Sequence, residues 1–584
     1  MDGFLSTLIL FLPLAGFTVL LFLNEDEQLD AIKWSTFGVS IATFILSLVM
    51  WAGFDNTQAG LQFVHQWQWL DIQVGDLAIT STYFVGVDGL SILLVVLTTF
   101  IMPIAILGSF KSHIIEERGR QKLYYSLLLL LEWAMLGVFF IQDLIIFYVF
   151  WEVTLVPMYF LIGIWGSEQR VYAAVKFFLY TMAGSILMLI AILFVGNTVG
   201  SFLLPDIIAA VQANPAIWGD TGAVTGSLLF FGFFIAFAIK VPVFPFHSWL
   251  PDAHVQAPTA GSVILAGVLL KMGTYGLVRF NLQMFPVESV QWAWLIASLG
   301  VIGILYGAWV SYAQDNVKKL VAYSSVSHLG FVVLGIFALN SQGIQGATLQ
   351  MVNHGISTGG LFLIVGILYE RYHTKEMAAY GGLWKIMPWF GGIALVVSLS
   401  SMGLPGLNGF VGEFTILLGS LGSEYLGFFY TLFATIGVIL AATYILRMYQ
   451  HVFMGEYQEP PDGTDSLQLH WTEVAVFVPI LVGIFWIGLQ PAPFFDAMGQ
   501  SAVQLSEHVD TAYEEYQAIE AVADDDAVDT ATDTLDVTGD AQADIIGDAD
   551  GESATSDDTS DSDTVDDATA TEGDDESADE PAEE

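Results

Sequence analysis

Cysteine is absent from the 584 residues, and this absence excludes a class of redox chemistry from the chain. Without thiolates, the chain cannot ligate an iron–sulfur cluster, form a disulfide or attach a c-type haem. Charged residues are also scarce, at 13%, whereas hydrophobic residues make up 55%. This composition, with a mean hydropathy of +0.63, lies far from that of a soluble domain. The chain is therefore expected to be a membrane protein.

Two further sequence signals are missing. No glycine-rich phosphate loop stands between a strand pattern and a helix pattern, so nucleotide binding is not indicated. The first apolar stretch, residues 4–23, lacks a basic segment before it and a small-residue cleavage site after it. We interpret this stretch as a retained membrane helix. The lipid bilayer is the expected environment, and nucleic acid is not an expected partner.

Basic residues are entirely missing from the C-terminus. Thirty of the sixty acidic residues lie from Glu507 onward, where there is no Lys or Arg. Because such a segment has little apolar surface to bury, residues 501–584 are predicted to be an acidic disordered tail. Its expected role is solvation, with docking or cation binding as the alternative, and truncation after Ser506 is expected to be harmless. Loops such as residues 24–30 are negatively charged, like the tail. So much negative charge favours a halophile, since molar salt screens the repulsion between charges within about 3 Å.

Long apolar runs dominate the rest of the chain. A helix needs about 20 apolar residues to cross a bilayer. The sequence therefore predicts an all-α polytopic membrane protein with about fourteen transmembrane helices, at residues 4–23, 34–53, 82–109, 123–141, 143–164, 173–196, 223–246, 259–280, 289–309, 320–339, 345–369, 389–420, 425–448 and 472–490.

The few basic residues predict an orientation, because they fall in or beside alternate loops that share one side of the membrane. Positively charged loops stay in the cytoplasm. The residues concerned are Lys111, Arg118, Arg120, Lys122, Arg170, Lys318, Lys319, Arg371, Lys375, Lys385 and Arg447. In the cytoplasmic (inner) membrane of a prokaryote, both termini are then expected on the outer face.

Two of the predicted spans contain helix breaks. Lys240 ends one apolar run and is followed by Pro242 and Pro245, while residues 401–413 carry four glycines and Pro405 before Glu413. Broken helices at membrane depth are tolerated where they line a cavity, and paired breaks indicate inverted repeats. The breaks fall in the seventh and twelfth spans, in corresponding positions of two five-helix repeats.

The predicted organisation follows from these breaks. It comprises helices one to three in residues 1–122, a first repeat of helices four to eight in residues 123–285, and a second inverted repeat of helices nine to thirteen in residues 286–450. A loop and the fourteenth helix occupy residues 451–500, before the tail at 501–584.

Ionisable residues inside these apolar spans are the candidate functional residues. They are Glu152, Lys240, Lys271, His328, His354 and Glu413, with Glu132 as a further buried acid. An ammonium at membrane depth costs at least about 2.5 kcal/mol, so such groups usually face a bundle interior, pair with one another and serve transport. Burial brings lysine and glutamate toward neutral pH, where histidine already titrates, and a set of this kind suits proton relay.

Less specific interpretations of these residues remain open. A single buried histidine is often only hydrogen-bonded packing, and Glu132 is as readily structural as functional. Glu152 with Lys240, or Lys271 with Glu413, are possible static ion pairs. Bis-histidine haem ligation is not favoured, because Pro251 and Asp252 predict a connecting loop between His247 and His254.

Three segments resemble one known family. Residues 150–166 (FWEVTLVPMYFLIGIWG), 247–259 (HSWLPDAHVQAPT) and 323–330 (YSSVSHLG) are similar to the antiporter-like subunits of respiratory Complex I. Residues 252–258 (DAHVQAP) point to the subunit M branch, whose mitochondrial counterpart is subunit 4. The resemblance covers nearly all of residues 1–500 and leaves the acidic tail outside the family pattern.

The resemblance implies a role for each matching position. Glu152 and Lys240 match the pair on the fifth and seventh helices of the family. Lys271 and His328 match its central connecting residues, and His354 matches an adjacent polar position. Glu413 matches the terminal acid of the twelfth helix, where subunit L carries a lysine.

The resemblance also implies an activity and partners. The chain is expected to be a proton-translocating subunit of NADH:quinone oxidoreductase, with L-like and N-like membrane subunits as neighbours. No cofactor is expected in this chain, and quinone, FMN and iron–sulfur clusters belong to other subunits. The alternatives are a subunit of a multisubunit monovalent cation/proton antiporter and, from a different class, a structural membrane scaffold.

Overall fold

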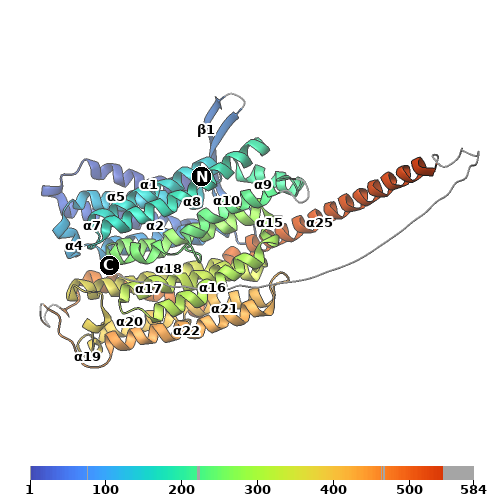
Figure 1. The fold of residues 1–584 in the computed structure, drawn as a ribbon. Coiled ribbons are helices and arrows are strands. Elements are labelled where there is room, and N and C mark those ends of the chain that lie inside the picture. The colour runs from blue at the N-terminus through green and yellow to red at the C-terminus, as the bar shows by residue number, and fades with distance from the viewer. Residues whose placement is uncertain (1, 75–76, 220–223, 462, 464–466, 544–584) are drawn as a thin grey trace, which may run out of the picture. The chain divides into compact units, whose positions relative to one another are not determined.

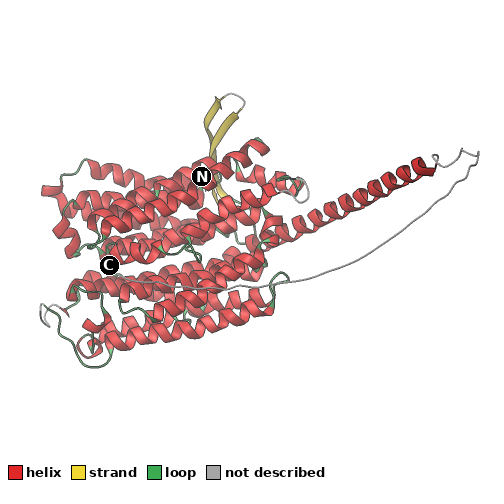
Figure 2. Cartoon of the chain, in the orientation of Figure 1, coloured by secondary structure: helices red, strands yellow, loops and turns green. Residues whose placement is uncertain are grey.

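The computed structural model describes residues 2–74, 77–219, 224–461, 463 and 467–543. Helices dominate these residues (Figure 2). The chain divides into two compact units, residues 1–521 and 522–584. All the packing discussed below lies within the first unit.

The N-terminal part contains α1 (Asp2–Leu21), α2 (Glu25–Ala52), the strands β1 (Gln62–Val74) and β2 (Leu77–Val87), α3 (Ile92–Gly108) and α4 (His113–Arg118). The part corresponding to the first repeat contains α5 (Gln121–Phe140), α6 (Leu144–Val153), α7 (Leu155–Trp165), α8 (Arg170–Val199), α9 (Leu204–Ala213), α10 (Val224–Lys240) and α11 (Trp249–Gln256). The eighth span follows as α12 (Thr259–Ile264), η1 (Leu265–Leu269), α13 (Leu270–Gly276), η2 (Leu277–Asn281) and α14 (Leu282–Met284).

The second half contains α15 (Pro286–Gln291), α16 (Ala293–Tyr312), α17 (Val317–Ile336), α18 (Ser341–Tyr372), η3 (Met377–Ala379), α19 (Leu383–Ile386), α20 (Pro388–Ser401), α21 (Asn408–Leu421) and α22 (Phe428–Phe453). The last elements are α23 (Trp471–Ala475), α24 (Phe477–Leu489) and α25 (Ala492–Ala543). The long helices of the first unit run side by side in Figure 1.

The helices agree with a polytopic membrane fold. Eleven helical stretches in the described part of the chain are long and apolar enough to span a bilayer. The shorter apolar helices α3 and α10, and the broken segment α20–α21, occupy the other three predicted spans. The arrangement is therefore consistent with about fourteen crossings.

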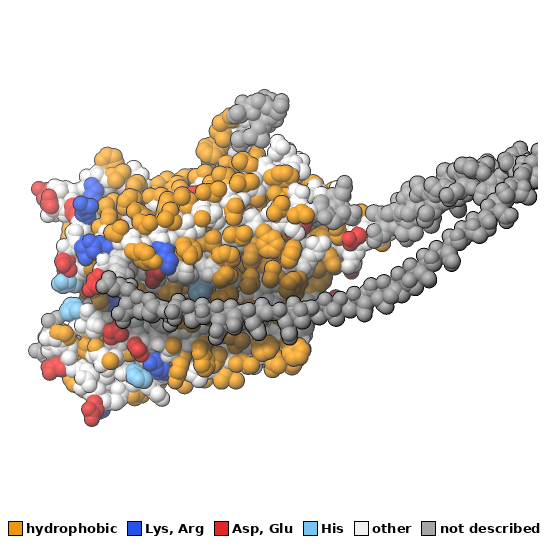
Figure 3. Space-filling view, viewed as in Figure 1, with side chains coloured by type: hydrophobic (Ala, Val, Ile, Leu, Met, Phe, Trp, Pro, Cys, Tyr) orange, Lys and Arg blue, Asp and Glu red, His pale blue; other side chains and the backbone are white. Residues whose placement is uncertain are grey.

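Contacts between loops define two opposite ends of the helix bundle. At the end that we call the basic end, Lys122 Nζ donates hydrogen bonds to the carbonyl oxygens of Leu21 and Leu23, both at 2.8 Å. Lys375 Nζ also donates to Ser167 Oγ there at 2.7 Å. Most Lys and Arg side chains visible in Figure 3 lie toward one end, while hydrophobic side chains cover the flank.

The other end, which we call the hairpin end, gathers the loops that alternate with those of the basic end. The Gln142 backbone N–H donates to Phe84 of β2 at 2.9 Å, which ties the turn between α5 and α6 to the hairpin. The Gly89 N–H donates to Ser501 Oγ of α25 at 3.0 Å. Successive spans therefore alternate in direction.

The β-hairpin corrects the prediction of a helix over the whole of residues 82–109 and adds two strands to an otherwise helical membrane fold. β1 and β2 pair antiparallel, and α3 begins only at Ile92. In β2, alternate residues are buried, namely Ser81, Tyr83, Val85 and Val87. This two-residue period belongs to a strand with one buried face. Counting apolar residues alone missed the period, because the strand runs directly into an apolar helix.

The acidic segment also differs from the expectation. Helix α25 extends from Ala492 to Ala543, through residues that were predicted to be disordered. Its first turns pack on the membrane domain, since Val509 is fully buried and His508 Nε2 lies 2.9 Å from the Gln283 carbonyl. Apolar residues here recur at helical spacing, which the count of acids concealed. The predicted tail from 544 to 584 lies outside the described residues.

Candidate functional site

The first break places Lys240 in an apolar setting. Helix α10 ends at Lys240 and the chain stays non-helical until α11 begins at Trp249. Lys240 is 1% exposed, and its Nζ donates to Thr154 Oγ1 at 3.2 Å. The same Nζ lies 5.0 Å from the centre of the Trp151 ring. An ammonium over an aromatic face gains cation–π stabilisation, which partly replaces its lost hydration.

The neighbouring fifth span is also interrupted, where it meets Lys240. Helix α6 ends at Val153 and α7 starts at Leu155. Pro157 cannot donate to the carbonyl four residues before it, so the helix is weakened at Val153. Thr154 Oγ1 donates to Trp151 O at 2.7 Å and so presents its oxygen to the lysine.

Glu152 is partly buried one residue before the end of α6, and one of its carboxylate oxygens is buried without a hydrogen-bond partner. Among the ion pairs of the described residues, none joins Glu152 to Lys240. The predicted possibility of a static Glu152–Lys240 pair is therefore wrong. The two charges interact across the joint of the fifth span and not by contact.

Lys271 lies at the centre of the eighth span, completely buried. Two π-helical segments, η1 and η2, flank its short helix α13. Lys271 Nζ donates to the Ala266 carbonyl, five residues earlier, and lies 2.6 Å from His354 Nδ1. π-Helical turns free backbone carbonyls and recur at functional sites. Here one of them helps to solvate a buried ammonium.

A glycine brings the eighth span against the first break. A Cβ at Gly273 would lie 2.8 Å from the Phe237 carbonyl and 3.0 Å from the Val241 nitrogen. Only glycine allows α13 to approach the end of α10 this closely. Lys271 and Lys240 therefore occupy directly packed elements.

The second break is richer in polar contacts. Helix α20 ends at Ser401 and α21 begins at Asn408, with Glu413 on its second turn and 3% exposed. Glu413 Oε1 lies 2.7 Å from His328 Nδ1 and accepts a hydrogen bond from Gln350 at 3.0 Å. His328 Nε2 lies 3.1 Å from the hydroxyl of Tyr444. The carboxylate is thus held by partners from α17 and α18.

A network of neutral polar groups lines the break itself. Asn408 Nδ2 donates to Ser357 Oγ at 3.2 Å, and Ser400 Oγ donates to Asn408 Oδ1 at 2.5 Å. Asn353 Nδ2 donates to the Asn408 carbonyl at 2.8 Å. A cavity of about 10 Å³ lies among these groups and the two histidines, close to the minimum that one water requires.

The structure brings four predicted site residues into one row. Lys271 contacts His354, and His328 contacts Glu413. The two histidine rings lie 6.0 Å apart, centre to centre. The static Lys271–Glu413 pair considered from the sequence is therefore wrong, because His354 and His328 stand between the two charges. The row joins α13, α18, α17 and α21 across the protein interior.

Sequence reasoning missed the neutral half of the site. Gln350, Asn353, Asn408, Ser357, Ser400 and Tyr444 all contact the row or the break. The signal that could have found the amides is their presence in apolar helices, where unpaired polar groups are costly. Glu132 is fully buried and accepts a hydrogen bond from Ser40 at 3.2 Å, apart from the row.

The segment between His247 and His254 was predicted to be a loop and is instead the helix α11. Pro251 stands in its first turn, where a missing N–H costs nothing. His254 is fully buried and stacks on Phe362 with ring centres 4.4 Å apart. Among the residues described, no group of three or more His, Asp and Glu is placed to hold a metal.

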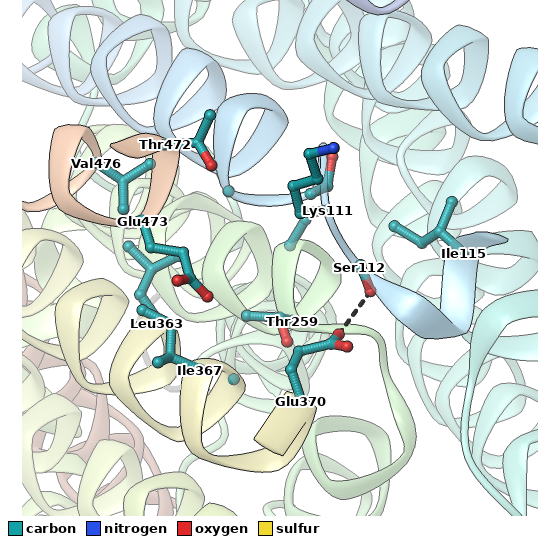
Figure 4. Close-up of a pocket in the computed structure, with 14 residues that line it drawn as sticks. Lys111, Ser112, Ile115, Thr259, Leu363, Ile367, Glu370, Thr472, Glu473 and Val476 are labelled. Carbon is teal, nitrogen blue, oxygen red and sulfur yellow. Dashed lines mark hydrogen bonds between the residues drawn. The ribbon is translucent and has the colours of Figure 1, made fainter. Parts of the chain in front are cut away.

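A narrow pocket of about 30 Å³ lies at the basic end, where α3, α12, α18 and α23 meet. Glu370 accepts a hydrogen bond from Ser112 Oγ at 2.8 Å (Figure 4). It also accepts one from the His113 N–H at 3.0 Å. Beside it, Arg371 binds both oxygens of Glu473, at 2.6 and 2.8 Å. The pocket is thus lined by the acids Glu370 and Glu473 and by Lys111 of the basic end.

Comparison with known proteins places the chain in a family. Residues 142–444 match the family described as "NADH:quinone oxidoreductase/Mrp antiporter, TM", and residues 30–138 match "NADH-ubiquinone oxidoreductase chain 4, amino terminus". NADH-quinone oxidoreductase subunit M of Rhodobacter capsulatus is 43% identical over 86% of this chain and 96% of its own length. NADH-ubiquinone oxidoreductase chain 4 of Marchantia polymorpha is 41% identical, over 86% and 97%.

Solved structures agree with this relationship. A chain of respiratory complex I from Thermus thermophilus superimposes with a TM-score of 0.73 at 29% identity, covering 86% of this chain and 99% of that one. A chain of the Mrp complex from Dietzia sp. DQ12-45-1b reaches the same TM-score at 20% identity, covering 89% and 99%, which shows a shared fold alone. The chain thus belongs to the family of NADH-quinone oxidoreductase subunit M and its counterpart, chain 4.

Proposed function

We propose that this chain is a proton-translocating membrane subunit of an NADH:quinone oxidoreductase, and that Glu152, Lys240, Lys271, His354, His328 and Glu413 carry the protons. The observation that supports this most directly is the row of buried ionisable groups from Lys271 to Glu413. Its groups come from four different elements and contact one another in the interior of a membrane domain. Burying such groups in a membrane domain costs free energy, and proteins usually keep them there for transport.

In this proposal, protons move along the row in the order of its contacts. Lys271 Nζ donates to His354 Nδ1, so a proton can pass along this 2.6 Å contact to the imidazole. The small cavity beside both histidines offers room for a bridging water between their rings. His328 then passes the proton from Nδ1 to Glu413 Oε1.

Lys240 and Glu152 supply the drive in this proposal. Two unit charges about 10 Å apart interact by about 1.7 kcal/mol at an effective dielectric constant of about 20. Moving one proton against 100 mV costs about 2.3 kcal/mol. One charge pair is therefore insufficient, and the pair at the first break must act together with the Lys271–Glu413 row.

The proposed orientation follows the charge asymmetry of the bundle. Loops of the basic end carry Lys111, Arg118, Arg120 and Lys122, which the positive-inside rule assigns to the cytoplasm. The pocket that holds Glu370 then opens toward the cytoplasm. The hairpin end and the start of α1 face the outer side of the inner membrane.

Oxidation of NADH and reduction of quinone belong, in this proposal, to other subunits of the complex. Its FMN and iron–sulfur clusters would also lie there, since this chain has no cysteine to ligate a cluster. The neighbours in the membrane would be L-like and N-like subunits. The chain acts on protons alone.

A subunit of a cation/proton antiporter is the second candidate, because the Mrp chain shares the fold. The sequence favours the first, since the subunit M and chain 4 relatives are more than 40% identical over most of their length. Purification of the native complex decides between them. Co-purification of NADH:quinone oxidoreductase activity with this chain supports the proposal, and isolation with antiporter subunits and without that activity refutes it.

A further inference from the structure

A second cavity, remote from the proton row, lies at the hairpin end. Its volume is about 280 Å³, near the lower limit for small-molecule sites. Residues 215–219, the start of α10, α15 with Trp292, and Tyr516 of α25 line it. Because α10 rises about 1.5 Å per residue, its first residue, Val224, lies about 24 Å from Lys240 along the helix.

One carboxylate, Glu288, stands among the lining residues. A Cβ at Gly226 would lie 1.9 Å from Glu288 Oε1, so this carboxylate rests directly on the glycine backbone. The cavity lining contains no Lys, Arg or His, and no ion pair within the described residues involves Glu288. Burial raises the pKa of Glu288 to about 7. Among the described residues, this charge therefore has no cationic partner.

Aromatic side chains line the same cavity as the carboxylate. Trp218 is 4% exposed and donates its Nε1–H to the Met284 carbonyl at 2.7 Å. Trp292 donates its Nε1–H to Ser227 Oγ at 3.0 Å. These bonds fix two indole rings in the cavity wall, with Tyr516 as a third aromatic residue. Aromatic walls around one anion provide the recognition that quaternary ammonium groups need.

We propose that this cavity, formed by Trp218, Glu288, Trp292 and Tyr516, binds an organic ammonium group of the trimethylammonium type. A metal ion fits less well, since Ca²⁺ takes six to eight oxygen ligands and the described side chains here offer one carboxylate, the Ser227 and Tyr516 hydroxyls and the Gln291 amide. A bulky, weakly hydrated cation instead uses the aromatic surface. Either a lipid headgroup or a free solute can carry this ammonium group.

The test measures binding of radiolabelled choline to the purified complex in phosphatidylglycerol vesicles. We expect one saturable site per chain, competed by tetramethylammonium and not by an equal concentration of K⁺. Glu288→Gln should weaken choline binding at least tenfold, because it removes the carboxylate that stands in the cavity wall. The matched control is Glu424→Gln, an exposed acid at the same end, which should leave binding within twofold of wild type.

A second variant guards against a folding defect in the first. Trp292→Leu should weaken choline binding by about twofold to thirtyfold, the range that loss of one cation–π contact gives, and Trp292→Phe should weaken it less. Absence of choline binding in the wild type overturns the proposal. Equal competition by K⁺, or unchanged affinity in Glu288→Gln, also overturns it.

The dependence on pH follows from Glu288. The pKa of about 7 predicts binding about tenfold weaker at pH 6 than at pH 8, since protonation removes the anion. Among the described lining residues, Tyr516 is the other titratable side chain, and tyrosine ionises well above this range. Binding that is constant between pH 6 and pH 8 contradicts the proposal.

The two sources of the ammonium group are separated with lipids. If the natural ligand is a headgroup, phosphatidylcholine in the vesicles competes with choline and co-purifies with wild type but not with Glu288→Gln. If it is a free solute, choline binding is the same in both kinds of vesicle. Loss of the proton-transfer function leaves these results unchanged, so the two proposals fail separately.

Discussion

The two broken helices of this protein bury their charges in opposite ways. At the first break, Lys240 makes one hydrogen bond, to Thr154, and otherwise contacts the aromatic residues Trp151 and Phe177. At the second break, Glu413 contacts His328 and Gln350 beside a network of amides and hydroxyls. Lys240 therefore has one hydrogen-bond partner, whereas Oε1 of Glu413 has two and its Oε2 is buried without one.

This difference assigns different tasks to the two breaks. A charge with few partners responds strongly to a neighbouring charge, because little else fixes its energy. A charge held by two hydrogen bonds, like Glu413, keeps its position and can pass protons along those bonds. We therefore expect the first break to act as the switch and the second as the conduit. Variants at the two breaks test this assignment.

The largest effect is expected at the first break. Lys240→Ala and Glu152→Gln should each lower proton pumping at least about tenfold, the scale of losing an acid–base group, while the complex still assembles. Glu152→Asp should retain most pumping, because the negative charge survives. NADH-driven proton uptake is measured per assembled complex. Normal pumping in both assembled neutral variants excludes the relay, and loss of subunit from the membrane instead supports the scaffold alternative.

At the second break, Glu413→Gln should lower pumping by about threefold to tenfold, less than Lys240→Ala. The amide keeps the contact with His328 but cannot accept its proton, while the surrounding polar groups keep the path hydrated. Gln350→Leu should have a smaller effect in the same direction. If Glu413→Gln impairs pumping more than Lys240→Ala does, the roles assigned to the two breaks are reversed.

The polar network of the second break should matter for stability more than for pumping. Asn408→Ala removes the hydrogen bonds to Ser357 and Ser400, a loss of about 1–3 kcal/mol for buried groups. Thermal unfolding of the complex should shift to lower temperature. Ser401→Ala is the control, because its buried hydroxyl has no partner. An equal shift in both variants shows that the network does not stabilise the break.

His247, beyond the first break, should have a small effect. His247 packs near Phe244 and Tyr306, at 5.7 and 5.0 Å between ring centres, and its Nδ1 has no partner. His247→Ala should keep pumping within about twofold, since it removes packing and not a member of the charged row. Loss of pumping in a fully assembled His247→Ala complex would show that the proton relay includes the segment between α10 and α11.

The smallest effect is expected from the acidic segment. Truncation after Ala521 should leave assembly and NADH:quinone activity unchanged, because it removes only the second unit. Truncation after Ser506 should reduce assembly, contrary to the sequence-based expectation, because it removes buried Val509 and the His508 and Asp510 contacts. Comparing the amount of complex in membranes from the two truncations measures this packing.

The sequence predicted much of the membrane domain because hydrophobic length and charge are local signals. The apolar runs identified the spans, and proline and glycine marked both breaks, at Pro242 and Pro405. The hairpin at residues 62–87 was missed because its two-residue period is short and merges with the apolar run of α3. Helix α25 was missed because acidic composition outweighed its few apolar residues.

The sequence by itself determined that the protein is a polytopic membrane protein, and it predicted the candidate charged groups inside its spans: Glu152, Lys240, Lys271, His328, His354 and Glu413. Only the tertiary structure decided which of them meet: Lys271 with His354, and His328 with Glu413. The physical reason is that hydropathy depends on neighbours along one helix, whereas pairing depends on how separate helices pack and where glycines let them approach.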